Sequence, residues 1–263
     1  MAAQIGTEGS VVAEGSITRT LRVLEVVCAK GPQPLKALSD ELDLAPPTLL
    51  RILRLMEQEG YVTRLPDRTW RGTMLLWSLG CAVNAQVGYS TLSQEHTDIL
   101  TAELEETSVY AVFEQGVVTY AAHSEPAKPV RAHVRLGRRH RLLSTTTGHA
   151  VLAWLDEAQV EVAVAEQRTT DETVAVEAVT EAMGRIRASG YAAGAGLKWP
   201  DLWAAAAPVF DASAQVVGAL GVTIPASRPD ELRERAIGAV VREADAMTRR
   251  LGGPRRRVLQ LEA

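Results

Sequence analysis

Two side chains one helical turn apart, Thr48 and Arg51, have the chemistry to read DNA bases. A guanidinium can donate two hydrogen bonds to the edge of a guanine, and a threonine can contact a thymine methyl group or a phosphate. Both residues face away from the apolar stripe of their helix, which is formed by Leu49, Ile52, Leu53 and Met56. Arg54, a turn further along, suits a phosphate contact. An ordinary solvated helix face remains the alternative interpretation.

Other residues near this helix have the right chemistry for the DNA backbone. Arg64 and Arg68 lie in a predicted hairpin and suit phosphate or minor-groove contacts, although a plain charged hairpin explains them equally well. Ser16 and Arg19, at the start of the first predicted helix, are candidates for phosphate contacts. Ser16 is also a good residue for an N-terminal helix cap.

Residue patterns for covalent or metal chemistry are missing. The sequence contains no Cys-x-x-Cys, His-Glu-x-x-His, Gly-x-Ser-x-Gly or P-loop motif, so we expect neither an enzyme nor a bound cofactor or metal. His133 and His140 have no carboxylate or cysteine companion in their stretch. The two cysteines, Cys28 and Cys81, fall in apolar helical patterns and are predicted to be reduced thiols in the core.

The elements that position the arginines form a winged helix-turn-helix. Helices are predicted over 17–29, 34–43 and 47–59, with a tight break at Leu44-Ala45, and two short strands follow around a Pro-Asp turn. The stripe expected to be buried on the first helix is Ile17, Leu21, Leu24 and Cys28. Residues 16–73 contain nine basic and seven acidic residues, so they carry +2 and the remainder carries −6. This asymmetry favours a nucleic-acid-binding head on an acidic body.

The rest of the chain predicts a linker helix and an α+β domain. The helix over 74–86 is apolar on several sides and needs a partner, for which a second copy is one possibility. After it we expect a helix over 90–106, a hairpin turning at Gln115-Gly116 and a half-exposed strand over 129–136. A helix near Thr147, another over 173–188, strands over 202–210 and 215–224 and a closing helix over 229–251 follow. Paired strands with helices around them indicate one antiparallel sheet.

Composition limits the class of protein. The chain has 263 residues, of which 46% are hydrophobic and 23% charged, with a formal net charge of −4. These values exclude a wholly disordered chain and argue against wholesale non-specific binding to nucleic acid. No apolar run reaches the length of a membrane span, and the first residues do not resemble a signal peptide, so a cytoplasmic protein without a membrane partner is expected.

Several stretches together resemble the IclR family of bacterial transcriptional regulators. The first two, SITRTLRVLEVV and LSDELDLAPPTLLRILRLMEQEGYV, resemble the opening helix and the helix-turn-helix of that family. The later ones, LGRRHRLLSTTTGHAVLAWL, GYAAG and AAAAPVFDASAQVVGALGVTIP, resemble its effector domain. The resemblance covers about residues 16–252. It implies a DNA-binding winged helix, a linker helix and a GAF-like effector domain, assembled as dimers or tetramers.

The same resemblance implies an effector site built from three stretches. Its candidate residues are Leu136, Gly137, Thr145, Thr146, Gly194, Trp199, Trp203, Ala204, Gly221 and Thr223. Hydroxyls and backbone N–H groups around Thr145 and Thr146 suit a carboxylate, although simple capping of the following helix is an equal alternative. The basic residues between Arg131 and Arg141 are candidates to pair with an anionic effector, but a solvated strand edge is favoured.

This chain departs from the family pattern at both sites. Pro46-Pro47 and Leu50 stand where relatives often have polar or basic residues and a histidine, so the operator of a relative should not be assumed. Gly194, Gly196, Leu197 and Ala204 stand where many relatives have acidic residues and a cysteine. Trp199 and Trp203 suggest a larger or more apolar effector, such as an aromatic acid. The alternative is that these tryptophans pack a core or an interface.

These observations predict a ligand-responsive regulator. The expected domains are a disordered tail over 1–15, the DNA-binding domain over 16–73, a linker and dimerisation helix over 74–89, the effector domain over 90–252 and a tail over 253–263. A dimer or tetramer would bind a palindromic DNA operator under the control of a small organic acid. The alternative is a constitutive DNA-binding regulator whose second domain only oligomerises.

Overall fold

The chain folds into two compact units, residues 1–87 and 88–263, which are described separately. The structure, a computed structural model, describes residues 15–87, 90–169, 174–195 and 199–254, apart from the side chains of residues 83–87 and 90. The tails expected over 1–15 and 253–263 lie mostly outside the described residues.

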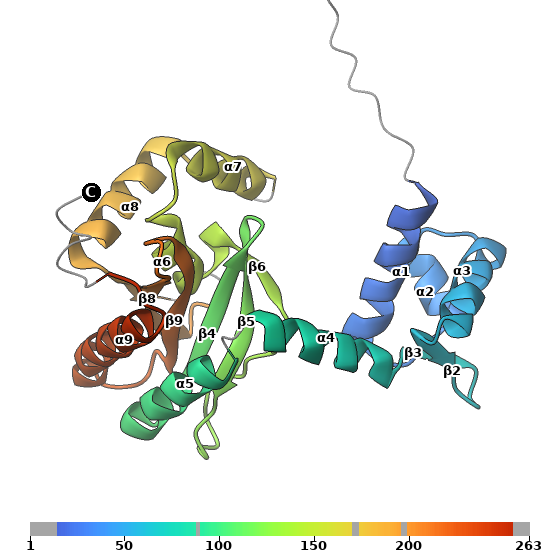
Figure 1. Cartoon of the computed structure of the whole chain (residues 1–263), viewed down its shortest axis with the longest axis horizontal. Helices are drawn as coiled ribbons and strands as arrows, with labels where there is room; N and C mark the ends of the chain where they lie inside the picture. Colours follow the sequence, from blue (N-terminus) through green and yellow to red (C-terminus); the bar gives the residue numbers. More distant parts are fainter. Residues whose placement is uncertain (1–14, 88–89, 170–173, 196–198, 255–263) are drawn as a thin grey trace, which may run out of the picture. The chain divides into compact units, whose positions relative to one another are not determined.

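The first unit is a winged helix-turn-helix (Figure 1). Its elements are α1 (Ser16–Lys30), β1 (Gln33–Pro34), α2 (Leu35–Leu42), α3 (Pro46–Gln58), β2 (Val62–Arg64), β3 (Thr69–Gly72) and α4 (Met74–Val87). The strands form an antiparallel sheet in the order β1-β3-β2. Helices α1–α3 and the wing close around the fully buried Trp70. All four residues expected in the stripe of α3 are buried in this core.

The buried face of α1 differs from the expected one. Val23 and Val27 are buried, whereas Ile17 is 77% and Leu21 is 56% exposed. The two valines lie about 100° around the helix from the expected stripe, of which only Leu24 packs, half-buried, against the core. Consequently the prediction that Cys28 is a core thiol is wrong. Cys28 and Cys81 are both exposed.

The start of α1 also corrects an expectation. The helix begins at Ser16 itself, and the N-cap position is occupied by Gly15. No side chain caps this end by a hydrogen bond. Ser16 is therefore the first helical residue rather than the cap, and its backbone oxygen accepts a hydrogen bond from the Thr20 hydroxyl.

The second unit is a six-stranded antiparallel sheet with helices on both faces (Figure 1). Its sheet follows the order β6-β5-β4-β9-β8-β7. Along the chain the elements are α5 (Ser90–Leu104), β4 (Thr107–Glu114), β5 (Val117–Ser124), β6 (Arg139–Arg141), the short 3-10 helix η1 (Leu142–Ser144), α6 (Thr146–Leu152), α7 (Glu157–Arg168), α8 (Val176–Ser189), β7 (Ala192–Ala195), β8 (Leu202–Phe210), β9 (Val216–Pro225) and α9 (Asp230–Arg250). The α+β class expected from the sequence is confirmed.

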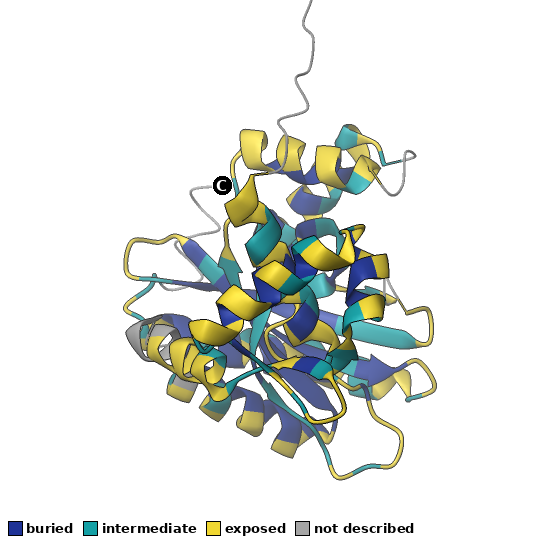
Figure 2. Ribbon diagram, turned by 90° about the vertical axis from the view of Figure 1, so that its right-hand side faces the viewer, coloured by how far each residue is buried: buried dark blue, intermediate teal, exposed yellow. Residues whose placement is uncertain are grey.

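The sheet separates two apolar cores. Helices α5 and α9 cover one face, and α6, α7 and α8 cover the other. Strand β8 contributes to both cores by alternation, since Ala205 and Ala207 belong to the α9 side and Ala206 to the α6 side. Figure 2 shows the strands in the buried colour beneath helices whose outer surfaces are exposed.

Several elements of this unit differ from the expectation, among them β6, which was not predicted. The strand expected over 129–136 is absent, because this segment is organised by Glu125 instead of by a strand partner. The Glu125 carboxylate accepts hydrogen bonds from Arg131 and the Val134 backbone and pairs with His133. Helix α7 was not predicted, although its capping box between Asp156 and Gln159 is a recognisable start signal.

Candidate nucleic-acid interface and ligand cavity

Helix α3 presents two arginines to solvent. Arg51 and Arg54 are exposed, and among the described residues neither has a hydrogen-bond or ion-pair partner. Thr48 is half-buried one turn before Arg51, and its backbone N–H donates to the Ala45 carbonyl at 2.9 Å. The two prolines that open α3 lack N–H groups, which fits them to the first turn, where helical N–H groups have no partner. The exposed face of α3 is thus free to meet a polyanion.

The wing, which is the hairpin of β2 and β3, carries two further arginines. Arg64 and Arg68 are exposed in the β2–β3 hairpin, and the Arg64 guanidinium lies 5.9 Å from the centre of the Trp70 ring. Arg68 adopts a left-handed backbone conformation (φ 67°). The turn is held by Asp67, which accepts hydrogen bonds from the Thr69 N–H and hydroxyl, and these bonds lower the pKa of the carboxyl group. The turn therefore fixes where the wing arginines emerge.

The start of α1 carries the two remaining candidates for DNA contact. Ser16 is exposed and Arg19 is half-buried. The backbone N–H of Arg19 donates to the Gly15 carbonyl at 3.1 Å.

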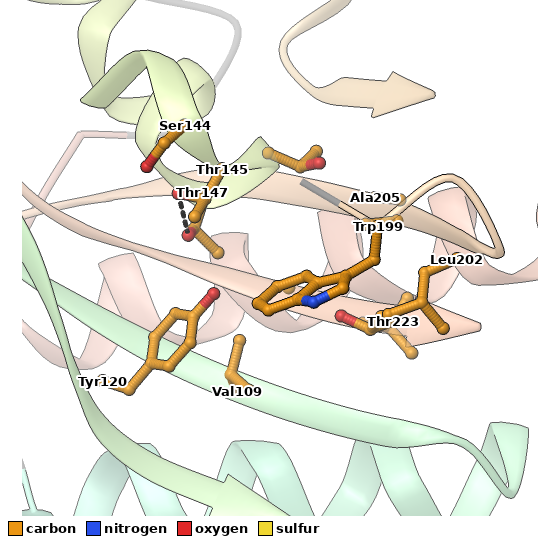
Figure 3. A pocket seen from close by; sticks show the side chains of 13 residues that line it. Val109, Tyr120, Ser144, Thr145, Thr147, Trp199, Leu202, Ala205 and Thr223 are labelled. Carbon is orange, nitrogen blue, oxygen red and sulfur yellow. Dashed lines mark hydrogen bonds between the residues drawn. The ribbon is translucent and has the colours of Figure 1, made fainter. Parts of the chain in front are cut away.

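The second unit contains a small cavity between α6 and the sheet (Figure 3). It has a volume of about 50 Å³. Hydroxyl-bearing and apolar side chains line it, and none of the lining residues carries a charge. They are Val109, Tyr120, Ser144, Thr145, Thr146, Thr147, Trp199, Leu202, Ala204, Ala205, Gly221, Val222 and Thr223.

A network of hydroxyl groups lies on the α6 side of the cavity. The Thr145 hydroxyl accepts the Gly148 N–H at 3.0 Å and lies 3.2 Å from the Thr147 hydroxyl. The Tyr120 hydroxyl points toward Thr147 (Figure 3), and burial raises the pKa of Tyr120. Tyr120 therefore stays a neutral hydrogen-bonding group at physiological pH. Thr145 does cap α6, as the alternative interpretation expected, and it also lines the cavity.

Two glycines allow this packing. A Cβ on Gly148 would lie 2.1 Å from the Leu142 carbonyl oxygen, so η1 and α6 meet backbone to backbone. A Cβ on Gly221 would lie 3.0 Å from the Thr147 methyl group. Both positions thus set how closely α6 approaches its neighbours.

The structure brings six of the ten effector candidates together. Those lining the cavity are Thr145, Thr146, Trp199, Ala204, Gly221 and Thr223. Trp203 points to the opposite face of β8, where it packs with the α9 core and meets the Arg233 guanidinium at 6.0 Å. Gly194 lines a separate hollow formed by β7 and α8. Leu136 and Gly137 lie in an exposed turn after the segment that Glu125 organises. Successive side chains of a strand point to opposite faces of the sheet, which explains why Trp203 and its neighbour Ala204 lie on different faces.

Seven residues of the cavity wall are not among the ten candidates: Val109, Tyr120, Ser144, Thr147, Leu202, Ala205 and Val222. Val109 and Tyr120 come from β4 and β5, which were recognised as a hairpin but not as part of the site. The pairing of β4 with β9 carries them to Gly221 and Thr223. No local motif in the sequence marks that pairing.

The described residues hold no group of three or more His, Cys, Asp or Glu side chains placed to bind a metal ion. Among them there is also no helix that is long and apolar enough to cross a membrane.

Comparison with known proteins gives matches to both units. Residues 16–66 match the model of the IclR helix-turn-helix domain, and residues 83–248 match that of the C-terminal domain of the bacterial transcriptional regulator IclR. The HTH-type transcriptional regulator KdgR of Escherichia coli is 25% identical over 237 residues, covering 87% of this chain and 90% of its own. The glycerol operon regulatory protein of Streptomyces griseus is 30% identical over 228 residues, covering 84% and 89%.

The fold is also shared with solved structures. One is an IclR homologue from Microbacterium hydrocarbonoxydans, crystallised in complex with 4-hydroxybenzoate. It superposes with a TM-score of 0.74 at 20% identity, over 89% of this chain and 99% of the other.

Proposed function

This chain belongs to the IclR family of bacterial DNA-binding transcriptional regulators, and from that premise we propose that a small aromatic acid controls its binding to DNA. The observation that carries the proposal is the cavity between α6 and the sheet, which combines hydroxyl groups with aromatic walls. Residues 16–73 serve as the DNA-binding domain, 74–89 as the linker and dimerisation helix and 90–252 as the effector domain.

The cavity suits a flat ligand with one polar end. Tyr120, Trp199, Val109 and Leu202 offer apolar surface, and the hydroxyls of Ser144 and Thr145–Thr147 gather on one side. No lining side chain is cationic, so a carboxylate would be held by neutral donors. The homologue crystallised with 4-hydroxybenzoate supports an aromatic acid as the first compound to test.

On the DNA side, Thr48 and Arg51 read bases in the major groove, while Arg54, Arg64, Arg68, Ser16 and Arg19 contact the backbone. The exposure of the arginines on α3 and the wing supports this assignment. A dimer would place two copies of α3 on a palindromic operator. The effector can control DNA binding only if it has different affinities for the bound and released arrangements.

The apolar surface of the first unit supports dimerisation. On α4, Met74 is 69% and Trp77 is 65% exposed, and on α1 Ile17 is 77% exposed. We define Met74 and Trp77, which lie about 60° apart around α4, as the apolar face of the head (the first unit). Exposed tryptophan and methionine are typical of interfaces, and a second copy of the same face is a fitting partner.

Trp77→Glu is expected to raise the dissociation constant of the dimer about tenfold or more, because it places a charge on the apolar face of the head. Sedimentation velocity over a concentration series measures the shift from dimer to monomer. Val162→Glu is the matched control, since Val162 is 57% exposed on α7, outside that face. Equal association of the two variants and the wild type would rule out this face as the interface.

A constitutive regulator is the second candidate, and the small cavity favours it. A volume of about 50 Å³ holds a few waters but no organic acid. In that case the second unit would only hold the copies together.

A gel shift on the DNA upstream of the protein's own gene, at fixed salt and with a panel of aromatic and aliphatic acids, tests the proposal. We expect a specific complex whose affinity one aromatic acid changes. A specific complex that no acid alters would instead support the constitutive candidate. In parallel, a true effector should raise the melting temperature, by about 3–6 °C at tenfold excess over its dissociation constant.

A further inference from the structure

The space in the ligand cavity is small because a side chain of the protein already lies in it. Figure 3 shows the indole of Trp199 between Tyr120 and Val109 on one side and Leu202 and Thr223 on the other. The ring lies among the residues that would surround a ligand. What remains beside it is about 50 Å³.

The Trp199 indole lies outside the apolar cores of the second unit. It is 44% exposed and belongs to neither apolar cluster of the second unit, whereas Trp70 of the first unit is 1% exposed. The backbone carbonyl of Trp199 accepts the Leu202 N–H at 3.0 Å, so the main chain has an anchor of its own. Swinging the side chain out would leave this backbone contact in place.

We propose that the Trp199 indole is an internal occupant of the effector site, meaning that it fills the site and that the effector displaces it. The size and shape of the indole then define the class of ligand. A space that accepts an indole accepts a flat aromatic ring system of up to two fused rings. The uncharged walls exclude a ligand that carries a charge on its ring system. The hydroxyl groups around Thr145 and Tyr120 contact the polar end of the ligand. This inference rests on the proposed function for the role of the site, but the occupation itself can be tested without an effector.

Occupation by Trp199 has a measurable effect on affinity. Only the fraction of molecules with the indole swung out can bind, so the apparent dissociation constant is the intrinsic one divided by that fraction. Removing the indole should therefore tighten the binding of an aromatic acid, by about tenfold if one molecule in ten is open. A tryptophan that stacked on the ligand would give the opposite sign.

The test uses the full-length Trp199→Ala variant and free indole as the probe. The variant is expected to fold with nearly the melting temperature of the wild type, because the side chain is outside the cores. Indole should then raise its melting temperature by about 3–6 °C at tenfold excess over the dissociation constant. The wild type should show no such rise in melting temperature. Trp203→Ala, which removes a side chain from the opposite face of β8, should show none either. Stabilisation of all three proteins, or of none, overturns the proposal.

Fluorescence separates this proposal from the proposed function. With 4-hydroxybenzoate, a change in tryptophan emission should persist in Trp203→Phe and disappear in Trp199→Phe. If an acid alters DNA binding but Trp199→Ala binds that acid more weakly than the wild type, the internal occupant is refuted and the regulator remains. If indole stabilises only Trp199→Ala while no acid affects DNA binding, the occupant stands and control by an acid fails.

Discussion

Replacing Gly148 with alanine is expected to lower the free energy of unfolding of the second unit by about 3 kcal/mol. The added Cβ would lie 2.1 Å from the Leu142 oxygen and 2.8 Å from two further backbone atoms of the same residue. No side-chain rotation can relieve a clash with backbone, so α6 must move away from η1. Because α6 carries the fully buried Ala150, Val151 and Leu152, this movement would loosen the core beneath the cavity. Urea unfolding followed by circular dichroism measures the loss.

The chain provides a matched control for this substitution. Gly184 lies in the middle of α8, and a Cβ built on it meets no atom within 4 Å. Gly184→Ala should therefore stabilise the unit, by about 0.5–1 kcal/mol, through helix propensity alone. Opposite signs for the two glycine-to-alanine changes would establish the close approach at Gly148. A loss at Gly148 no greater than about 0.5 kcal/mol would show that η1 and α6 are not in backbone contact.

Arg51→Ala is expected to weaken binding to the specific operator by about 1–3 kcal/mol, which is about 5- to 150-fold in Kd. Arg51 is exposed on the outer face of α3. The variant would lose the bidentate bond to a guanine that we propose for Arg51, together with discrimination at that base pair. Competition gel shifts on the operator and on operators changed at single positions measure both effects. The variant should keep the melting temperature of the wild type, since no described residue depends on the Arg51 side chain for a hydrogen bond or ion pair.

Two further arginines provide the controls. Arg54→Ala should weaken binding to all sequences alike and reduce the slope of log K against log salt by about 0.9, as expected for one lost phosphate contact. Arg185→Ala removes the same charge from α8 in the second unit, where the side chain pairs with Glu181. A footprint that Arg51→Ala leaves unchanged, or that Arg185→Ala weakens equally, would remove Arg51 from the reading of bases.

The helix-turn-helix could be predicted from local patterns because its core is built from them. The stripe of α3 follows the helical repeat, and all four residues are buried as expected. The same reasoning failed for most of the α1 stripe, since Ile17, Leu21 and Cys28 are exposed and only Leu24 packs against the core. Periodicity identifies an apolar face but does not say whether the face lies in the protein's own core or on its surface.

The second unit shows where sequence reasoning stops. The hairpin β4–β5 and the pair β8–β9 were foreseen from turns and alternation, and both are confirmed. The strand expected over 129–136 was wrong because the side chain of Glu125 binds that segment instead. The ligand cavity needs the long-range pairing of β4 with β9 and the choice of face at Trp203 and Ala204. A one-residue shift of strand register exchanges these two side chains, and no local signal sets the register.

The central position of β4 and β9 in the sheet has a consequence for how the chain is made. The head is complete once α4 has left the ribosome, and its contacts lie within the first 87 residues. The sheet of the second unit, in contrast, cannot close until β9 arrives to pair with β4. Until then β4 and β5 form a hairpin with one long apolar edge unpaired, which is an aggregation-prone state. A message cut short before β9 would thus yield a folded helix-turn-helix unit attached to an incomplete, aggregation-prone sheet that lacks the β9 wall of the ligand cavity.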